Sequence, residues 1–130
     1  MLDGRNIVGI GLDIIEVSRI ESVLNRWGSK FEQRVFTPKE LDYCRSKGNY
    51  YQKLASRFAV KEAVFKALGT GWQAGVGWRE IEVTNNHMGK PKVTLNGETE
   101  RISKSLGVKL ILVSMTHTKE YGAAQVILTS

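Results

Sequence analysis

The chain has 130 residues, a formal net charge of +6 and a single cysteine, Cys44. This length predicts one domain, residues 1–130, around one hydrophobic core, and one cysteine excludes an internal disulfide or a thiolate zinc cluster. The sequence has no apolar run long enough to cross a bilayer and no signal-peptide pattern, so we expect a cytoplasmic protein without membrane contact. The basic charge predicts an anionic partner, which can be a nucleic acid, an acidic protein or a polyphosphate ligand.

Alternating residues predict a first strand over Ile7–Ile15. Its two faces differ in chemistry: one carries Val8, Ile10, Leu12 and Ile14, and the other carries Gly9, Gly11 and Asp13. Glycine inside a strand often marks the close approach of a ligand or of another backbone. On the second face, the carboxylate of Asp13 therefore lies beside two glycines, which have no side chain.

Three helices are predicted after this strand. Helical spacing of apolar residues predicts the first over Val17–Trp27, and a capping box with proline at the first helical position, Thr37–Glu40, begins the second, which runs toward Ser46. The third and longest helix is expected from about Tyr51 to Leu68. Because its apolar residues extend nearly all the way round, this helix is expected to be buried.

The second half of the chain is richer in strands. We expect a glycine-rich loop over 72–77, strands over 78–84, 92–95, 108–116 and 121–128, and a helix over 98–106. The order predicts an α+β fold in which a mostly antiparallel sheet packs on a long buried helix, with shorter helices around it.

Asp13 and Glu62 are the first candidates for chemistry, since each belongs to an element otherwise suited to burial. Two converging carboxylates repel and raise each other's pKa unless a cation lies between them, and such oxygen ligands suit Mg²⁺. The alternative is that Asp13 is a hydrogen-bond acceptor at the end of its strand, while Glu62 forms an i,i+4 ion pair with Lys66.

The cations of the long helix are the second group of candidates. Lys66, Lys61 and Arg57 are either phosphate ligands or ordinary solvated cations. The exit of the helix, Gly69–Gly71, can offer backbone N–H groups to an anion, although many helices end in glycine. His117, at the end of a strand, is as a lone histidine more often a hydrogen-bonded structural residue than a catalyst.

Two segments, Gly9–Ile20 and Arg57–Gly71, closely resemble the two signature motifs of the short, holo-[acyl-carrier-protein] synthase type of the 4′-phosphopantetheinyl transferase family. The resemblance extends over essentially the whole chain, with Phe31–Leu41, Gly89–Pro91 and Ser114–Ala124 in matching places and order. It implies an enzyme that moves the 4′-phosphopantetheine arm of coenzyme A onto a serine hydroxyl of apo acyl carrier protein and releases adenosine 3′,5′-bisphosphate.

The resemblance also implies roles for three catalytic residues. Asp13 and Glu62 match the family's Mg²⁺ ligands, and Lys66 matches the lysine that contacts the pyrophosphate. A serine hydroxyl is a poor nucleophile until its proton is removed. Glu62, acting directly or through a metal-bound water, is our candidate base.

The short members of this family are homotrimers that hold coenzyme A between adjacent subunits, so we expect sites at subunit interfaces here. The matching positions for coenzyme A contacts, with Arg57 added as a phosphate ligand, are Arg57, Lys66, Gly69, Thr70, Gly71, Gly89, Lys90, Pro91, Thr116, His117 and Thr118. His117 is a contact candidate in this set and not a required catalyst.

The basic charge then has a candidate partner, because acyl carrier proteins are acidic. Arg19 matches the family arginine that pairs with the carrier, and Arg26, Lys30 and Arg34 are candidate neighbours by charge. The alternative function is a non-enzymatic basic module that binds nucleic acid, which the charge alone supports. With both motifs present, we expect no nucleic-acid partner.

Overall fold

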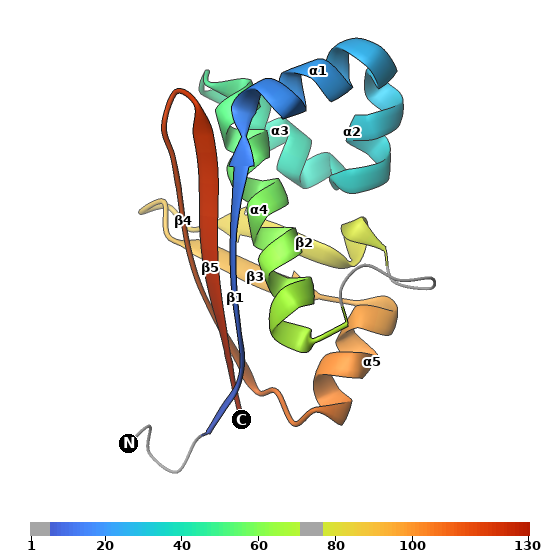
Figure 1. Cartoon of the computed structure of the whole chain (residues 1–130), viewed down its shortest axis with the longest axis vertical. Helices are drawn as coiled ribbons and strands as arrows, with labels where there is room; N and C mark the ends of the chain where they lie inside the picture. The colour runs from blue at the N-terminus through green and yellow to red at the C-terminus, as the bar shows by residue number, and fades with distance from the viewer. Residues whose placement is uncertain (1–5, 71–76) are drawn as a thin grey trace.

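A long helix lying across an antiparallel sheet organises the molecule (Figure 1). The computed structural model describes residues 6–70 and 77–130. Its elements, in chain order, are β1 (Ile7–Glu16), α1 (Val17–Trp27), α2 (Ser29–Val35), α3 (Pro38–Ser46), α4 (Tyr50–Leu68), η1 (Trp78–Glu80), β2 (Ile81–Asn85), β3 (Pro91–Leu95), α5 (Gly97–Ser105), β4 (Leu110–His117) and β5 (Tyr121–Thr129). The predicted α+β class and the antiparallel pairing are confirmed.

The larger sheet has the order β1-β5-β4, so β5 lies in the centre and the two other strands form its edges. Ala124 of β5 pairs with Asp13 on one side and with Met115 on the other. β2 and β3 form a separate two-stranded sheet, in which Asn85 pairs with Pro91. Figure 1 shows α4 between the two sheets and α1–α3 gathered at one end of the molecule.

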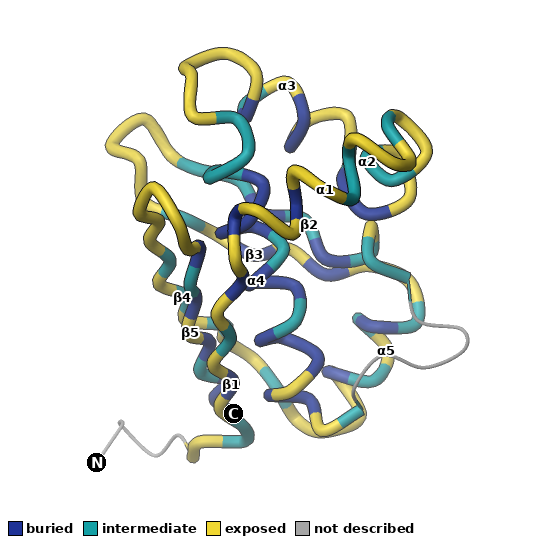
Figure 2. Tube along the Cα trace, turned by 45° about the horizontal axis from the view of Figure 1, so that its top comes forward, coloured by how far each residue is buried: buried dark blue, intermediate teal, exposed yellow. Residues whose placement is uncertain are grey.

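The glycines of β1 allow the backbone of α4 to approach the strand closely. A Cβ atom added to Gly9 would lie 2.0 Å from the carbonyl oxygen of Ala67, and one added to Gly11 would lie 1.9 Å from that of Ala63. The sequence left open whether a ligand or another backbone approaches these glycines, and the answer is the helix backbone. The predicted burial of α4 is confirmed, since Leu54 and most of its apolar residues are buried (Figure 2).

Two local predictions were incomplete. The predicted strand over 78–84 begins only at Ile81, because residues 78–80 form a short 3₁₀ turn in which the Glu80 carboxylate accepts hydrogen bonds from the backbone N–H groups of Gly77 and Thr99. Helix α2 was not predicted. Gly28, with φ +55°, does end α1 as expected, but a second helix of seven residues begins at the next residue.

The face of the larger sheet that lies opposite α4 is apolar and uncovered. Leu12 is 66% exposed, and Ile10 and Ile14 are similarly open to solvent. The register places Ile10, Ile127 and Leu112 in one row across this face. Contiguous exposed apolar surface of this kind marks an interaction site. None of the helices in the described residues is long and apolar enough to pass through a bilayer.

Candidate active site

β1 brings Asp13 against the last two turns of α4. The Nζ atom of Lys66 lies 2.9 Å from Oδ1 of Asp13 and donates a second hydrogen bond, of 3.1 Å, to the carbonyl oxygen of Leu12. Within residues 6–70 and 77–130, Lys66 therefore pairs with Asp13 and not with Glu62, which was the alternative ion pair. Two of the predicted catalytic side chains meet directly.

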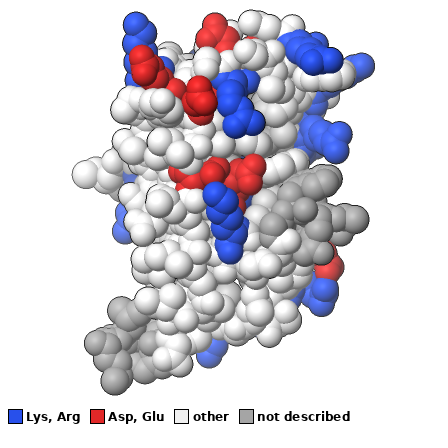
Figure 3. All heavy atoms as spheres, viewed as in Figure 1, with Lys and Arg blue, Asp and Glu red and all other residues white. Residues whose placement is uncertain are grey.

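Glu62 belongs to the same cluster, as the electrostatics of its carboxyl group show. Burial raises the pKa of Glu62, the negative charge of Asp13 raises it further, and the positive charges of Lys66 and Arg19 lower it. Figure 3 shows acidic and basic atoms side by side in the middle of this face of the molecule. The chain thus gathers two carboxylates and two cations where β1, α1 and α4 meet.

The donor set of this cluster fits a divalent cation. Oδ2 of Asp13 is buried without a hydrogen-bond partner in the described part of the chain, and a buried unpaired carboxylate oxygen is costly unless a cation or donor reaches it. The described residues contain no group of three or more His, Cys, Asp or Glu side chains that could hold a metal ion. An ion held by Asp13 and Glu62 would therefore need water or substrate oxygens as its other ligands, which is how Mg²⁺ is usually bound.

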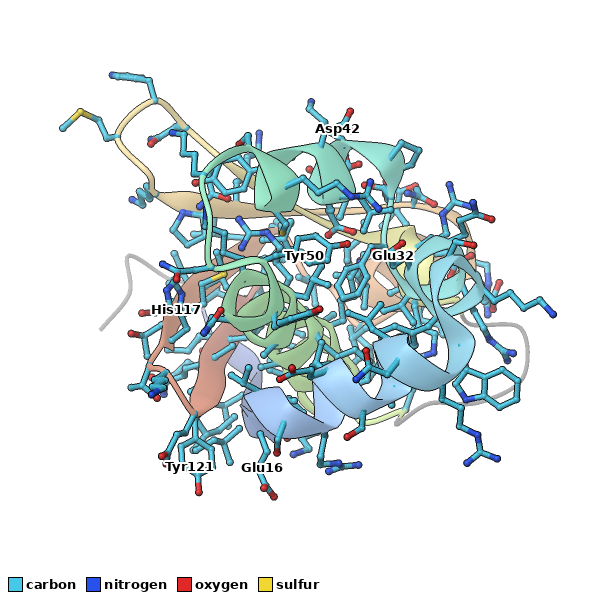
Figure 4. The ribbon with its side chains drawn as sticks, turned by 90° about the horizontal axis from the view of Figure 1, so that it is seen from above. Glu16, Glu32, Asp42, Tyr50, His117 and Tyr121 are labelled. Atoms are coloured by element: carbon cyan, nitrogen blue, oxygen red, sulfur yellow. The ribbon has the colours of Figure 1, made fainter. Side chains whose placement is uncertain are left out.

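A second candidate site is a pocket of about 270 Å³ beside the N-terminal half of α4. It is lined by Tyr43, Lys53, Ser56, Arg57, Asn85, Met115, Thr116 and His117. Three predicted contact residues, Arg57, Thr116 and His117, are thus brought together. Figure 4 shows His117 on the β4 side of α4. The remaining lining residues were not predicted, because they come from four different elements and no local pattern marks them.

This pocket is strongly cationic. Arg57 is only 2% exposed, and its guanidinium lies 4.7 Å above the ring of Tyr43. The Nε atom of Arg57 and the Nζ atom of Lys53 are both buried without a hydrogen-bond partner among the residues described. Since buried cations require a compensating charge or acceptor, the pocket is suited to an anion.

The turn between β2 and β3 lies next to this pocket. The Nδ2 atom of Asn85 donates to the carbonyl oxygen of Gly89 over 3.0 Å, and Gly89 has the left-handed conformation, with φ +85°. The predicted contact residues Gly89, Lys90 and Pro91 are therefore tied to the end of β2.

Thr118, another predicted contact residue, lies in the turn between β4 and β5. Its hydroxyl accepts hydrogen bonds from Glu120 N and Tyr121 N, so this side chain shapes the β4–β5 turn.

The helix exit differs from its prediction as an anion-binding segment. The N–H groups of Gly69 and Thr70 donate to the carbonyl oxygens of Lys66 and Phe65, and so they close α4. Their backbone donors are already used, because a helix end needs partners for its last carbonyl groups. Gly71 lies outside the described residues.

Both alternatives considered for Lys61, a phosphate ligand and a solvated cation, are wrong. Its side chain is fully buried, and Nζ lies 2.9 Å from Oε1 of Glu40 and also donates to the carbonyl oxygens of Trp78 and Ile81. Oε2 of Glu40 in turn accepts from the N–H of Val83 over 2.8 Å. Burial lowers the pKa of Lys61, while the Glu40 carboxylate raises it. This pair joins α3, α4 and β2 and has no access to a ligand.

Helices α1 and α2 form a third feature, a groove of about 430 Å³. It is lined by Val23, Trp27, Lys30, Phe31 and Arg34. Trp27 is 53% exposed, and the guanidinium of Arg26 lies 5.3 Å from the centre of its ring. The sequence placed Trp27 only in the apolar stripe of α1. The groove itself depends on α2, which was not predicted.

The carboxylate cluster and the Arg57 pocket lie at opposite edges of the larger sheet. The first is built on β1 with Asp13, and the second uses Met115, Thr116 and His117 of β4, while β5 runs between them.

Known proteins resemble this chain over nearly its whole length. The family described as the 4′-phosphopantetheinyl transferase superfamily matches residues 9–126. Holo-[acyl-carrier-protein] synthase from Solibacter usitatus is 48% identical over 94% of this chain and 98% of its own length, and the protein of that name from Halothermothrix orenii is 42% identical over 93% and 96%.

Solved structures agree with the sequence relatives. The holo-(acyl-carrier-protein) synthase from Bacillus anthracis in complex with CoA (3′,5′-ADP) has a TM-score of 0.78 and 40% identity and covers 95% of this chain and 97% of its own. The Helicobacter pylori holo-[acyl-carrier-protein] synthase in complex with coenzyme A has a TM-score of 0.81 and 28% identity, and it covers 92% of this chain and 98% of its own. The chain therefore belongs to the 4′-phosphopantetheinyl transferase superfamily and is a phosphopantetheinyl transferase enzyme.

Proposed function

We propose that this chain transfers 4′-phosphopantetheine from coenzyme A to a serine hydroxyl of an apo acyl carrier protein and releases adenosine 3′,5′-bisphosphate. The relatives named as holo-[acyl-carrier-protein] synthases support this reaction. The observation that carries the proposal is the meeting of Asp13, Glu62 and Lys66 where β1 crosses α4. Phosphoryl transfer needs positioning and charge neutralisation more than covalent work by the protein.

Each member of the cluster has a role in this reaction. Lys66, with its side chain 52% exposed, binds the pyrophosphate of coenzyme A. Glu62 takes the proton of the attacking serine hydroxyl, directly or through a metal-bound water. The serine oxygen then forms a bond to phosphorus as the bond to the bisphosphate leaving group breaks.

Asp13 and Glu62 are the proposed Mg²⁺ ligands. The buried Oδ2 of Asp13, which has no hydrogen-bond partner within residues 6–70 and 77–130, supports this assignment. When bound, Mg²⁺ would offset the negative charge of the pyrophosphate and its leaving group.

The Arg57 pocket is proposed to hold the adenosine and 3′-phosphate of coenzyme A. The nitrogens of Arg57 and Lys53 that have no hydrogen-bond partner among the described residues supply positive charge. Thr116, His117 and the Gly89–Pro91 turn supply the surrounding contacts.

We infer that the active assembly is a homotrimer with sites at its subunit interfaces. The exposed apolar face of the larger sheet supports self-association. The placement of the two candidate sites at opposite sheet edges is compatible with sharing, because the head-to-tail contacts of a closed ring join different surfaces of adjacent copies. A hydrodynamic mass three times the 14.6 kDa of one chain is the expected result.

The carrier protein is proposed to dock on α1. Arg19 lies close enough to Glu62 to affect its pKa, so a carrier held by Arg19 presents its serine near the reacting groups. Arg26 and the groove beside Trp27 extend this surface. Basic side chains around an apolar groove match an acidic helix, and such docking weakens as salt concentration rises.

The direct test is mass spectrometry of the carrier. The purified protein is incubated with apo acyl carrier protein, coenzyme A and Mg²⁺, with a second reaction in which EDTA replaces Mg²⁺. We expect the carrier to gain the mass of one phosphopantetheine in the first reaction only. No mass gain with any of several apo carriers would reject the proposed function.

A further inference from the structure

Asn85, the last residue of β2, connects two elements of the proposed coenzyme site. Its Oδ1 atom accepts a 2.5 Å hydrogen bond from Nη2 of Arg57. Its Nδ2 atom donates a 3.0 Å hydrogen bond to the carbonyl oxygen of Gly89 in the β2–β3 turn. One amide side chain thus fixes both the guanidinium on α4 and the turn.

The bond to Arg57 orients a buried cation without cancelling its charge. Nη1 of Arg57 donates to the carbonyl oxygen of Lys53 over 3.3 Å, and Nε has no partner in the part of the chain that the structure describes. Both acceptors of the guanidinium are therefore neutral. A carboxylate at position 85 would form an ion pair with Arg57 and reduce its attraction for a phosphate, whereas an amide keeps that attraction.

The bond to Gly89 sets where the turn lies, while another side chain sets its shape. Oδ1 of Asn86 accepts hydrogen bonds from the N–H groups of Met88 and Lys90, both over 2.9 Å, and so closes the turn internally. Asn85 is the residue that links this closed turn to α4. Its two bonds therefore have a function that the internal bonds of Asn86 do not share.

We propose that Asn85 is a positioning residue for the adenosine-bisphosphate end of coenzyme A. It holds the Arg57 guanidinium and the Gly89–Pro91 turn in one arrangement before the ligand binds, so that less ordering is needed on binding. This inference rests on the proposed function, because it assumes that the pocket around Arg57 receives that end of the coenzyme.

The test compares Asn85→Ala with Thr84→Ala, a change at the neighbouring position of the same strand. For each variant, KM for coenzyme A, kcat at saturating apo carrier and the calorimetric Kd for adenosine 3′,5′-bisphosphate are measured on the full chain in its native assembly. We expect Asn85→Ala to raise KM and Kd about tenfold, the usual effect of losing a hydrogen bond to a charged group. The kcat of Asn85→Ala is expected to stay within about twofold of the parent value. For Thr84→Ala, KM, kcat and Kd are all expected to stay within about twofold of the parent values.

A double-mutant cycle with Arg57→Gln separates positioning from a general loss of structure. If Asn85 acts through Arg57, the effect of Asn85→Ala on Kd is smaller in the Arg57→Gln background than in the parent, and any effect that remains there comes from the Gly89–Pro91 turn. Independent, multiplying effects, or an unchanged Kd in Asn85→Ala, would overturn the proposal. Binding of adenosine 3′,5′-bisphosphate needs no carrier and no turnover, so the Asn85 result can be read even if the transfer reaction is not observed.

Discussion

Lys66 and Asp13 are 53 residues apart in the sequence and form a 2.9 Å ion pair where α4 crosses β1. The lysine side chain is 52% exposed, whereas that of Asp13 is 15% exposed. A pair with one open partner contributes little to stability, because solvent screens it. Its exposed cation and the second oxygen of Asp13, which has no hydrogen-bond partner in the described part of the chain, instead leave two opposite charges available to a ligand and an ion.

Replacing Lys66 is therefore expected to affect activity far more than stability. In Lys66→Ala, the positive charge at the pyrophosphate is lost, and kcat/KM for coenzyme A should fall by a factor of about 10²–10³. The melting temperature should change by no more than about 3 °C. Steady-state kinetics and thermal unfolding measure the two effects.

Lys104→Ala is the matched control for this prediction, since Lys104 forms an exposed 3.7 Å pair with Glu100 on α5, away from both candidate sites. In this control, kcat/KM for coenzyme A and the melting temperature should both stay unchanged. Equal kinetic effects in the two variants would remove Lys66 from the proposed site.

Glu62 is expected to reduce the stability of the metal-free protein. Burial and the nearby charge of Asp13 both raise the pKa of Glu62, so its ionised form is held at a cost in free energy. Glu62→Gln removes that charge at nearly constant volume. Its melting temperature without metal should be higher than that of the parent by about 2 °C, while the gain in melting temperature on adding Mg²⁺ and the transferase activity should both be lost.

Thermal unfolding with EDTA and with Mg²⁺ distinguishes the two effects of this variant. Glu82→Gln, on β2, is a control carboxamide change outside the cluster, and it should retain the response to Mg²⁺. If Glu62→Gln kept the same Mg²⁺-induced shift as the parent, Glu62 would not be a ligand.

Local sequence patterns predicted most elements correctly but could not distinguish the two cations Arg57 and Lys61. Both lie on the same buried helix, one turn apart, and both were candidate phosphate ligands. Their roles differ because Glu40 of α3 packs against Lys61, whereas the pocket beside β4 opens at Arg57. Those are contacts between distant parts of the chain, which periodicity and capping signals do not report.

The meeting of Asp13 with α4 was anticipated only as one of two possibilities. The glycines beside Asp13 marked a close approach, but only the fold shows that the approaching group is the backbone of Ala63 and Ala67. Helix α2 was missed because Gly28 gave a clear stop signal and the seven residues after it are too few to show a helical period.

The buried pair between Lys61 and Glu40 is expected to matter for stability. Lys61→Met leaves the Glu40 carboxylate buried and unpaired, which should lower the free energy of unfolding by about 3–5 kcal/mol at neutral pH. An unpaired buried carboxylate has a raised pKa in the folded state, so its cost appears as pH rises through that pKa and vanishes below the unfolded value. The deficit of Lys61→Met should therefore shrink as the pH is lowered toward about 4.

Urea denaturation at several pH values measures this deficit. In the double variant Lys61→Met/Glu40→Gln, neither charge of this pair remains, and much of the lost stability should return. A deficit that stays constant with pH would mean that packing, and not the orphaned carboxylate, accounts for the loss.

Sharing of the active site between copies predicts that two inactive variants restore activity to each other. Asp13→Ala disables the β1 edge and Arg57→Ala the pocket at the β4 edge, so each variant alone should be inactive or strongly impaired. In assemblies refolded from an equal mixture, random neighbours combine an intact β1 edge with an intact β4 edge in about one quarter of the sites. The mixture should therefore recover about one quarter of the parent activity in the carrier mass assay.

Mixing Asp13→Ala with Glu62→Gln, two changes at the same edge, should recover none, because every β1 edge is then defective. Recovery that is absent from the first mixture, once exchange of chains has been verified by native mass spectrometry, would show that each site belongs to one chain.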